Sequence, residues 1–222
     1  MIKLTSPFTI IKKSFEIFTK KENFVFFVKI YLPLGVLSLI SLAFIGIPFL
    51  SQTSGTPLGN IITTVLNILF FFTSIYVNAA GILAIIKVLE GKDLNAKKIY
   101  VEAFKKFGKF ILLSLVIYLS YILGLVLLII PFFIVIVWFA FGQFVMIERG
   151  FGIKKSILES KKLVKGIYWK VLLRMVVFGV FWILMEAALG LLPYSLGVVI
   201  FYISGALFVL PSFILYKEIS SE

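Results

Sequence analysis

The sequence predicts an all-α integral membrane protein in which six transmembrane helices form three hairpins, each preceded by a basic amphipathic interfacial helix. The main observation is that none of the 22 Lys and Arg residues lies in 30–86, 110–147 or 175–216. These blocks hold 57, 38 and 42 residues. Because a helix needs about 20 apolar residues to cross a hydrocarbon core, each block has the length of roughly two crossings.

The composition indicates a single membrane domain covering 1–222. Hydrophobic residues make up 61% of the chain, and its mean hydropathy is +1.14. The segments between the blocks, 87–109 and 148–174, have 23 and 27 residues. Soluble domains need at least about 50 residues, so neither segment is long enough to form one. The first 21 residues contain no apolar run of seven, so we expect no cleavable signal peptide.

The basic segments fall on one face of the membrane if each block folds back on itself. Segments 1–29, 87–109 and 148–174 carry net charges of +4, +4 and +6. The positive-inside rule then places this face and both termini in the cytoplasm, and we expect the plasma (cytoplasmic) membrane of a prokaryote. The same rule accounts for the net charge of +12, and the chain has no nucleic-acid recognition motif, so we expect no nucleic-acid partner.

Turn residues near the middle of each block favour the hairpins. Segment 51–59 contains Gly and Pro, Gly124 and Pro131 flank the second centre, and Pro193 precedes the third. Glycine tolerates unusual φ angles and proline cannot continue a helix. The predicted crossings are about 24–50, 60–88, 109–129, 131–148, 169–190 and 194–217. The second block allows roughly 19 residues per pass, so a shallow pair that does not fully span is an alternative there.

A basic amphipathic stretch precedes each hairpin, with predicted helices at about 7–22, 95–108 and 152–166. Apolar and basic residues occupy opposite faces of these stretches, which is typical of helices that lie in the interfacial plane. We expect anionic membrane lipids as partners, with headgroup contacts from Lys12, Lys13, Lys20, Lys105, Lys106, Lys109, Lys161, Lys162, Lys165 and Trp169. The stretches suggest a threefold internal repeat; alternatively, any cytoplasmic loop near anionic lipid becomes basic and amphipathic.

Polar side chains inside the blocks form a second set of candidate site residues. Steps of three and four residues place a polar stripe along one face of the second crossing: Asn60, Thr64, Asn67, Ser74 and Asn78. The stripe either forms interhelical hydrogen bonds or lines a polar cavity. Two further groups are candidates to face it across a packed interface: Ser114, Tyr118 and Tyr121 on the third crossing, and Gln143 on the fourth.

Glu186 is the single carboxylic acid within the three blocks. Charges inside a membrane are costly, so such a residue is a functional candidate. It lies four residues before Gly190, about 6 Å from the predicted helix end at 1.5 Å per residue. It is therefore either an interfacial or structural residue, or a proton or cation site. Separately, Lys29, Lys170 and Arg174 lie within a turn or two of the basic face and can snorkel to that face.

The residue types that most enzymes need are scarce. The chain has no His, no Cys and ten Asp and Glu, which removes the commonest general base, the commonest transition-metal ligand and thiolate chemistry. It contains no phosphate-binding loop, nucleophile elbow or nucleotide fingerprint. We therefore expect no enzyme, no cofactor and no metal site.

Two stretches resemble the signatures of a known family. Segment 89–92, continued by 101–107, is similar to the first signature. Segment 124–131, followed by Val145-Met-Ile-Glu148 and by Ser156 and Ser160, is similar to the second. The family is the membrane domain found in some glycerophosphodiester phosphodiesterases, with its uncharacterised YciC-like relatives. A glycine often follows the proline in its pattern, where this chain has Phe132.

The resemblance covers roughly residues 85–175 and implies a small multi-pass membrane protein of unassigned role. The phosphodiesterase activity of that family resides in a separate soluble domain with a catalytic His. This chain has no His and no room for such a domain, so the activity is not expected here.

Three functions are compatible with these residues. The first is a non-catalytic protein that binds lipid or acts as a scaffold, with an unidentified protein partner or a homo-oligomer allowed. The second is a transporter or channel for a small solute, an ion or a lipid, using the polar stripe and Glu186. The third, an intramembrane enzyme, requires two facing catalytic groups where the blocks offer one acid. The sequence favours the first.

Overall fold

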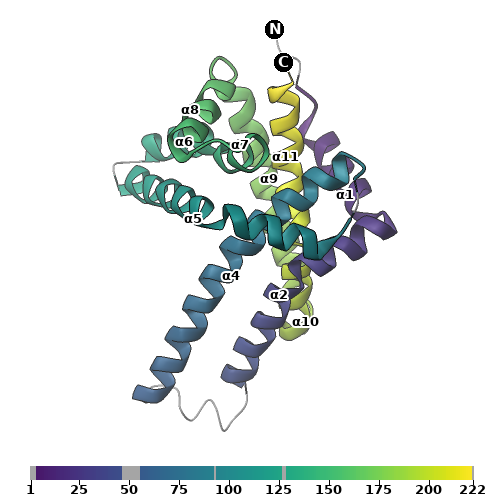
Figure 1. Ribbon diagram of the computed structural model, residues 1–222, viewed down its shortest axis with the longest axis vertical. Coiled ribbons are helices and arrows are strands. Elements are labelled where there is room, and N and C mark those ends of the chain that lie inside the picture. The colour runs from purple at the N-terminus through teal and green to yellow at the C-terminus, as the bar shows by residue number, and fades with distance from the viewer. Residues whose placement is uncertain (1–3, 47–55, 93, 127–128, 222) are drawn as a thin grey trace.

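A computed structural model describes residues 4–46, 56–92, 94–126 and 129–221, and within these ranges the chain forms ten α-helices and no strand (Figure 1). Six segments are long and apolar enough to cross a membrane: Lys21–Ser41, Pro57–Leu89, Ala96–Val126, Pro131–Arg149, Tyr168–Leu189 and Tyr194–Ser220. The prediction of an all-α membrane protein with six candidate spans is confirmed.

The chain begins with α1 (Pro7–Thr19) and α2 (Lys21–Gly46). Proline occupies the first position of α1, where its missing N–H has no helical partner to lose. The helix ends three residues before the predicted boundary at 22, because Lys20 takes an extended ψ of 125°. The predicted crossing at 24–50 corresponds to α2, and its last residues, 47–50, lie outside the described ranges.

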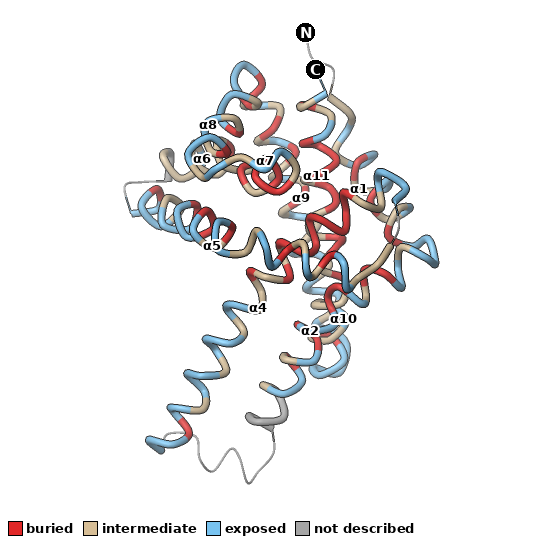
Figure 2. The backbone as a smooth tube through the Cα atoms, in the orientation of Figure 1, coloured by how far each residue is buried: buried red, intermediate tan, exposed pale blue. Residues whose placement is uncertain are grey.

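Helix α4 (Pro57–Leu89) is the longest helix of the described chain, and its two halves differ. Thr56 caps it by accepting a hydrogen bond from the Gly59 amide at 3.1 Å. Its second half is buried from Val77 through Ile86, apart from Asn78, whereas most of its first half is exposed (Figure 2). At 1.5 Å per residue the 33 residues extend about 50 Å, which exceeds a hydrocarbon core of about 30 Å.

Helix α5 (Ala96–Val126) corrects one prediction, because the interfacial helix expected at 95–108 and the crossing expected at 109–129 form one continuous helix. A lone glycine, Gly108, stands at the expected boundary, and a single glycine costs too little to end a helix. Tertiary contacts also fix the first turns. The Tyr100 hydroxyl donates to the Ile30 carbonyl at 2.5 Å, and the Tyr76 hydroxyl donates to the Tyr100 carbonyl at 2.7 Å.

The predicted crossing at 131–148 is divided into α6 (Ile129–Phe139) and α7 (Gly142–Arg149). At the break, the Phe141 amide donates to the buried Ser160 hydroxyl at 3.1 Å. Ser160 belongs to α8 (Ile153–Val164), the third predicted interfacial helix. A side chain from another helix therefore satisfies the backbone group that the break exposes.

The fifth crossing is α9 (Tyr168–Leu189), close to the predicted 169–190. The predicted sixth crossing is divided at Ser204 into α10 (Tyr194–Ile203) and α11 (Gly205–Ser220). Helix α10 packs more extensively on α2 than on α9, its predicted hairpin partner. The helical core forms where α4 meets α2, α5 and α11 (Figures 1 and 2).

Both ends of the described chain lie on the same side of the molecule (Figure 1). The Thr5 amide donates to the Glu218 carboxylate at 3.3 Å, and α1 packs against α11. Helices α6, α7 and α8 group together beside them, because α8 packs on both α6 and α7. The outer half of α4, from Pro57 to Ser74, extends to the opposite side.

Candidate functional site

A hollow of about 740 Å³ lies between α6, α8 and the start of α9. It is called the α8 hollow below, and its lining combines apolar, aromatic and basic side chains. The lining residues are Ile134, Trp138, Leu158, Lys161, Lys162, Val164, Lys165, Gly166, Tyr168 and Trp169. The structure thus brings together four of the residues that the sequence predicts as lipid-headgroup contacts: Lys161, Lys162, Lys165 and Trp169.

The amphipathic pattern of α8 determines which side chains reach the hollow. One face of the helix is buried through Ser156, Ser160 and Val164, which leaves Lys161 and Lys162 on the outer face. Beyond the helix, Gly166 has a φ of +84°, a left-handed conformation that glycine adopts at little cost. This turn directs the chain into α9.

Two ammonium groups of the hollow have no carboxylate partner within the described chain. The Lys161 Nζ lies 3.9 Å from the centroid of the Trp138 ring, a cation–π contact. Lys165 is exposed and forms no ion pair with a described residue. Lys162, by contrast, pairs with Glu159 at 2.9 Å, and this hydrogen bond holds the pKa of Glu159 below its usual range. The hollow therefore presents an excess of positive charge.

The remaining lining is suited to the boundary between lipid headgroups and acyl chains. Trp169 is 77% exposed, and its ring meets Tyr168 edge-on with centroids 5.3 Å apart. Exposed Trp and Tyr residues favour this boundary because one end of each ring system is apolar and the other is polar. Ile134 and Leu158 add apolar surface beside them.

The other predicted headgroup residues lie outside the α8 hollow. Five of them are exposed: Lys12, Lys13, Lys20, Lys105 and Lys109. Lys106 is different, because its ammonium donates to the Ile147 carbonyl at 3.0 Å and to the Glu102 carboxylate at 3.3 Å. Lys106 thus joins α5 to the end of α7.

The polar stripe lies on α4, and its hydrogen bonds stay within that helix. The Thr64 hydroxyl donates to the Asn60 carbonyl and the Ser74 hydroxyl to the Phe71 carbonyl, both at 2.8 Å. The side chains of Asn60, Asn67 and Asn78 form no hydrogen bond with described residues. Asn60, Thr64 and Asn67 are exposed, whereas Ser74 and Asn78 are half-buried.

The residues expected to face the stripe bind elsewhere. The Gln143 amide donates to the Ser114 hydroxyl at 3.1 Å, which joins α7 to α5. Tyr121 meets the Phe132 ring edge-on with centroids 6.4 Å apart, and Tyr118 is exposed. None of these side chains forms a hydrogen bond with the stripe.

Glu186 is exposed and lines a separate hollow of about 370 Å³ between α9 and α10. Tyr194 and Tyr202 line the same hollow, and none of the polar-stripe residues does. Glu186 forms no ion pair or hydrogen bond with a described side chain. The two groups that the transport hypothesis requires, the stripe and Glu186, therefore border different spaces.

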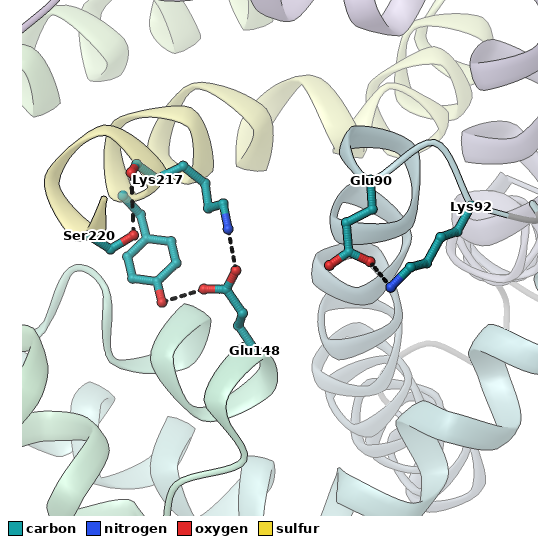
Figure 3. A network of polar contacts seen from close by, with 6 residues as sticks. Glu90, Lys92, Glu148, Lys217 and Ser220 are labelled. Atoms are coloured by element: carbon teal, nitrogen blue, oxygen red, sulfur yellow. Dashed lines mark hydrogen bonds and ion pairs between the residues drawn. The ribbon is translucent and has the colours of Figure 1, made fainter. Parts of the chain in front are cut away.

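One polar cluster was not predicted from the sequence. The Glu148 carboxylate accepts hydrogen bonds from the Tyr216 hydroxyl and the Lys217 ammonium, both at 2.5 Å, and so joins α7 to α11 (Figure 3). Nearby, Lys92 pairs with Glu90 at 2.8 Å and keeps the pKa of Glu90 below its usual range. The one sequence signal for this cluster was that Glu148 belongs to the segment Val145-Met-Ile-Glu148, which resembles the family signature.

Arg174 also corrects a prediction, because its side chain is buried rather than snorkelling. Its guanidinium donates to the carbonyls of Leu4, Thr5 and Lys170 at 2.9, 3.0 and 2.8 Å. It thereby fixes the N-terminal segment to α9.

No protein-family model, curated protein or solved structure matches this chain. The resemblance to the membrane domain of glycerophosphodiester phosphodiesterases therefore stays a prediction. Among the described residues, no three acidic side chains gather closely enough to hold a metal ion. The α8 hollow is thus the arrangement with the clearest binding chemistry.

Proposed function

We propose that this multi-pass membrane protein is non-catalytic and binds anionic phospholipid headgroups in the α8 hollow. The observation that carries the proposal is that Lys161 and Lys165 border an apolar, Trp-containing hollow and lack a carboxylate partner in the described chain. A lipid phosphate supplies the missing negative charge, while its acyl chains contact Ile134 and Leu158.

The energetics favour recognition of anionic over neutral lipid. Each Lys near an anionic membrane surface contributes about 1 kcal/mol, and a lysine ammonium binds phosphate as a compact point charge. Glu159 is neutralised by Lys162, so it opposes the binding of an anion only weakly. The excess charge in the hollow therefore selects headgroups that carry a net negative charge.

Lipid binding is preferred to the alternative, a small-solute, ion or lipid transporter or channel. A transport path built on the polar stripe and Glu186 requires both to line one passage. The hollow that contains Glu186 is lined by α9, α10 and the turn between them. The separate positions of the polar stripe and Glu186 thus give the transport hypothesis no specific support.

Replacing both Lys161 and Lys165 with glutamine is expected to weaken the binding of phosphatidylglycerol roughly 30-fold, at about 1 kcal/mol per lysine. Binding of phosphatidylcholine is expected to stay unchanged, because a neutral headgroup gains little from either charge. Native mass spectrometry of the detergent-purified protein, titrated with each lipid, measures both affinities.

The matched control is the double replacement of Lys97 and Lys154 with glutamine, which removes the same charge from exposed positions outside the hollow. It is expected to leave the preference for phosphatidylglycerol almost intact. An equal loss in the two double variants would mean that overall charge, rather than this hollow, selects the lipid, and would refute the site.

A further inference from the structure

Most residues in the outer half of α4, from Pro57 to Ser74, are exposed (Figure 2), and many of them are apolar. Seven large apolar side chains between Leu58 and Phe72 are at least 43% exposed. A continuous band of this kind belongs in lipid or against another protein. Because α4 is long and apolar enough to cross a membrane, we expect this half to lie within the membrane.

Asn67 lies inside this apolar band, between Val65 and Leu69. Its carboxamide is exposed and forms no hydrogen bond with the described chain. An amide facing hydrocarbon without a partner costs several kcal/mol, so polar residues within membranes usually face other helices. Asn60, one heptad earlier, has the same exposure and the same lack of a side-chain partner.

Asn60 and Asn67, whose amides have no partner in the described chain, lie on a face that α4 does not use to pack against the described residues. Ile62, Leu66 and Phe70 recur at four-residue intervals and are half-buried, and the Phe70 ring meets the Tyr202 ring of α10 with centroids 5.4 Å apart. Each residue turns a helix by about 100°, so Asn60, Thr64 and Asn67 form a separate exposed face. This face is called the α4 seam below.

The spacing of the α4 seam residues along the sequence matches that of the core positions in a pair of packed helices. The seam residues follow steps of four and three, and Phe71, Ser74 and Asn78 continue the pattern. This is the alternation of core positions in a left-handed two-helix coiled coil. A single polar residue such as Asn at a core position commonly fixes the register of the two strands.

We propose that the α4 seam binds the α4 seam of a second copy of this chain, so that the protein forms a two-fold symmetric dimer. Copies inserted with the same orientation are parallel, and the two-fold axis places Asn67 opposite Asn67 of the other copy. A carboxamide both donates and accepts hydrogen bonds, so two identical amides satisfy each other. This surface is remote in sequence from the α8 hollow, and the proposal does not depend on lipid binding there.

The absence of cysteine from the chain makes cross-linking a direct test. Thr64→Cys places a thiol on the seam, whereas Val65→Cys places one on the neighbouring face, about 100° away. Both positions are exposed. In vesicles at a low protein-to-lipid ratio, oxidation is expected to yield at least about fivefold more dimer from Thr64→Cys, since symmetry opposes each seam residue to itself.

Equal or greater cross-linking at position 65 overturns the proposal, because it indicates random collision. In native membranes, Thr64→Cys is expected to give an adduct of twice the chain mass. An adduct with a different protein, in place of this dimer, assigns the seam to another partner and also overturns the proposal.

A second measurement tests the amides themselves. Replacing Asn60 and Asn67 together with leucine is expected to weaken dimerisation roughly tenfold to a hundredfold, measured by energy transfer between labelled copies in vesicles. The control, Ile61→Leu with Ile68→Leu, has the same seven-residue spacing on the lipid-facing side and is expected to leave dimerisation unchanged. If the asparagine variant associates as tightly as the wild type, the amides are not the contact.

Discussion

Replacing Arg174 with glutamine is expected to lower the free energy of unfolding by about 3 kcal/mol. The arginine side chain is 9% exposed, and its guanidinium binds three backbone carbonyls on two separate segments of the chain. A glutamine amide is shorter and has two N–H donors instead of five, so it leaves at least one carbonyl unpaired. Thermal unfolding in detergent measures the loss.

The same replacement is expected to loosen the N-terminal segment. Leu4 and Thr5 are held by Arg174 from α9 and by Glu218 from α11. With the arginine gone, trypsin is expected to cleave faster at Lys12 and Lys13, which are exposed on α1. Lys154→Gln, which also removes one positive charge but at an exposed position, is the control and is expected to alter stability by less than about 0.5 kcal/mol. Indistinguishable melting of the two variants contradicts the role assigned to Arg174.

The six spans could be predicted from the sequence because membrane insertion depends on local composition. Long segments without Lys or Arg are visible along the chain without knowledge of any contact. The breaks within the fourth and sixth spans were not predictable in this way. One occurs where the Phe141 amide binds Ser160, and the other next to Gly205, which packs against Tyr31. Both depend on residues far away in the sequence.

The candidate site was predictable in part for the same reason. Helical periodicity identified Lys161, Lys162 and Lys165, and Trp169 has the aromatic character of an interface residue. The opposite wall of the α8 hollow comes from α6, and no sequence pattern connects Trp138 with Lys161. Likewise, the spacing placed the polar-stripe residues on one face of α4, but it did not reveal that Gln143 binds Ser114 instead of the stripe.

Replacing Gly205 with alanine is expected to destabilise the protein by about 3 kcal/mol, because Tyr31 occupies the space that a Cβ requires. A Cβ at Gly205 would overlap the ring carbons of Tyr31, and a Cβ at Gly81 would overlap its hydroxyl. The ring is 4% exposed and packs against α4 on one side and α11 on the other. A buried ring between two helices is costly to displace, so Gly81→Ala is expected to destabilise as well.

The two glycine variants overlap different atoms of Tyr31, the hydroxyl for Gly81→Ala and the ring carbons for Gly205→Ala. This difference provides an internal test of the prediction. The Tyr31 hydroxyl has no hydrogen-bond partner within the described chain, so Tyr31→Phe alone is expected to change stability little. Combined with Gly81→Ala, Tyr31→Phe removes the overlapping oxygen and is expected to recover a large part of the lost free energy of unfolding. Combined with Gly205→Ala it is expected to recover nothing, because the overlapping ring carbons remain.

The control for both glycines is Gly179→Ala on α9, where an added Cβ meets no atom within 4 Å. This variant is expected to be neutral or slightly stabilising, since alanine favours a helix more than glycine does. Thermal unfolding in detergent ranks all the variants on one scale. If Tyr31→Phe restores the two glycine variants equally, or if Gly179→Ala is as destabilised as they are, the ring is not wedged between α4 and α11 as the structure places it.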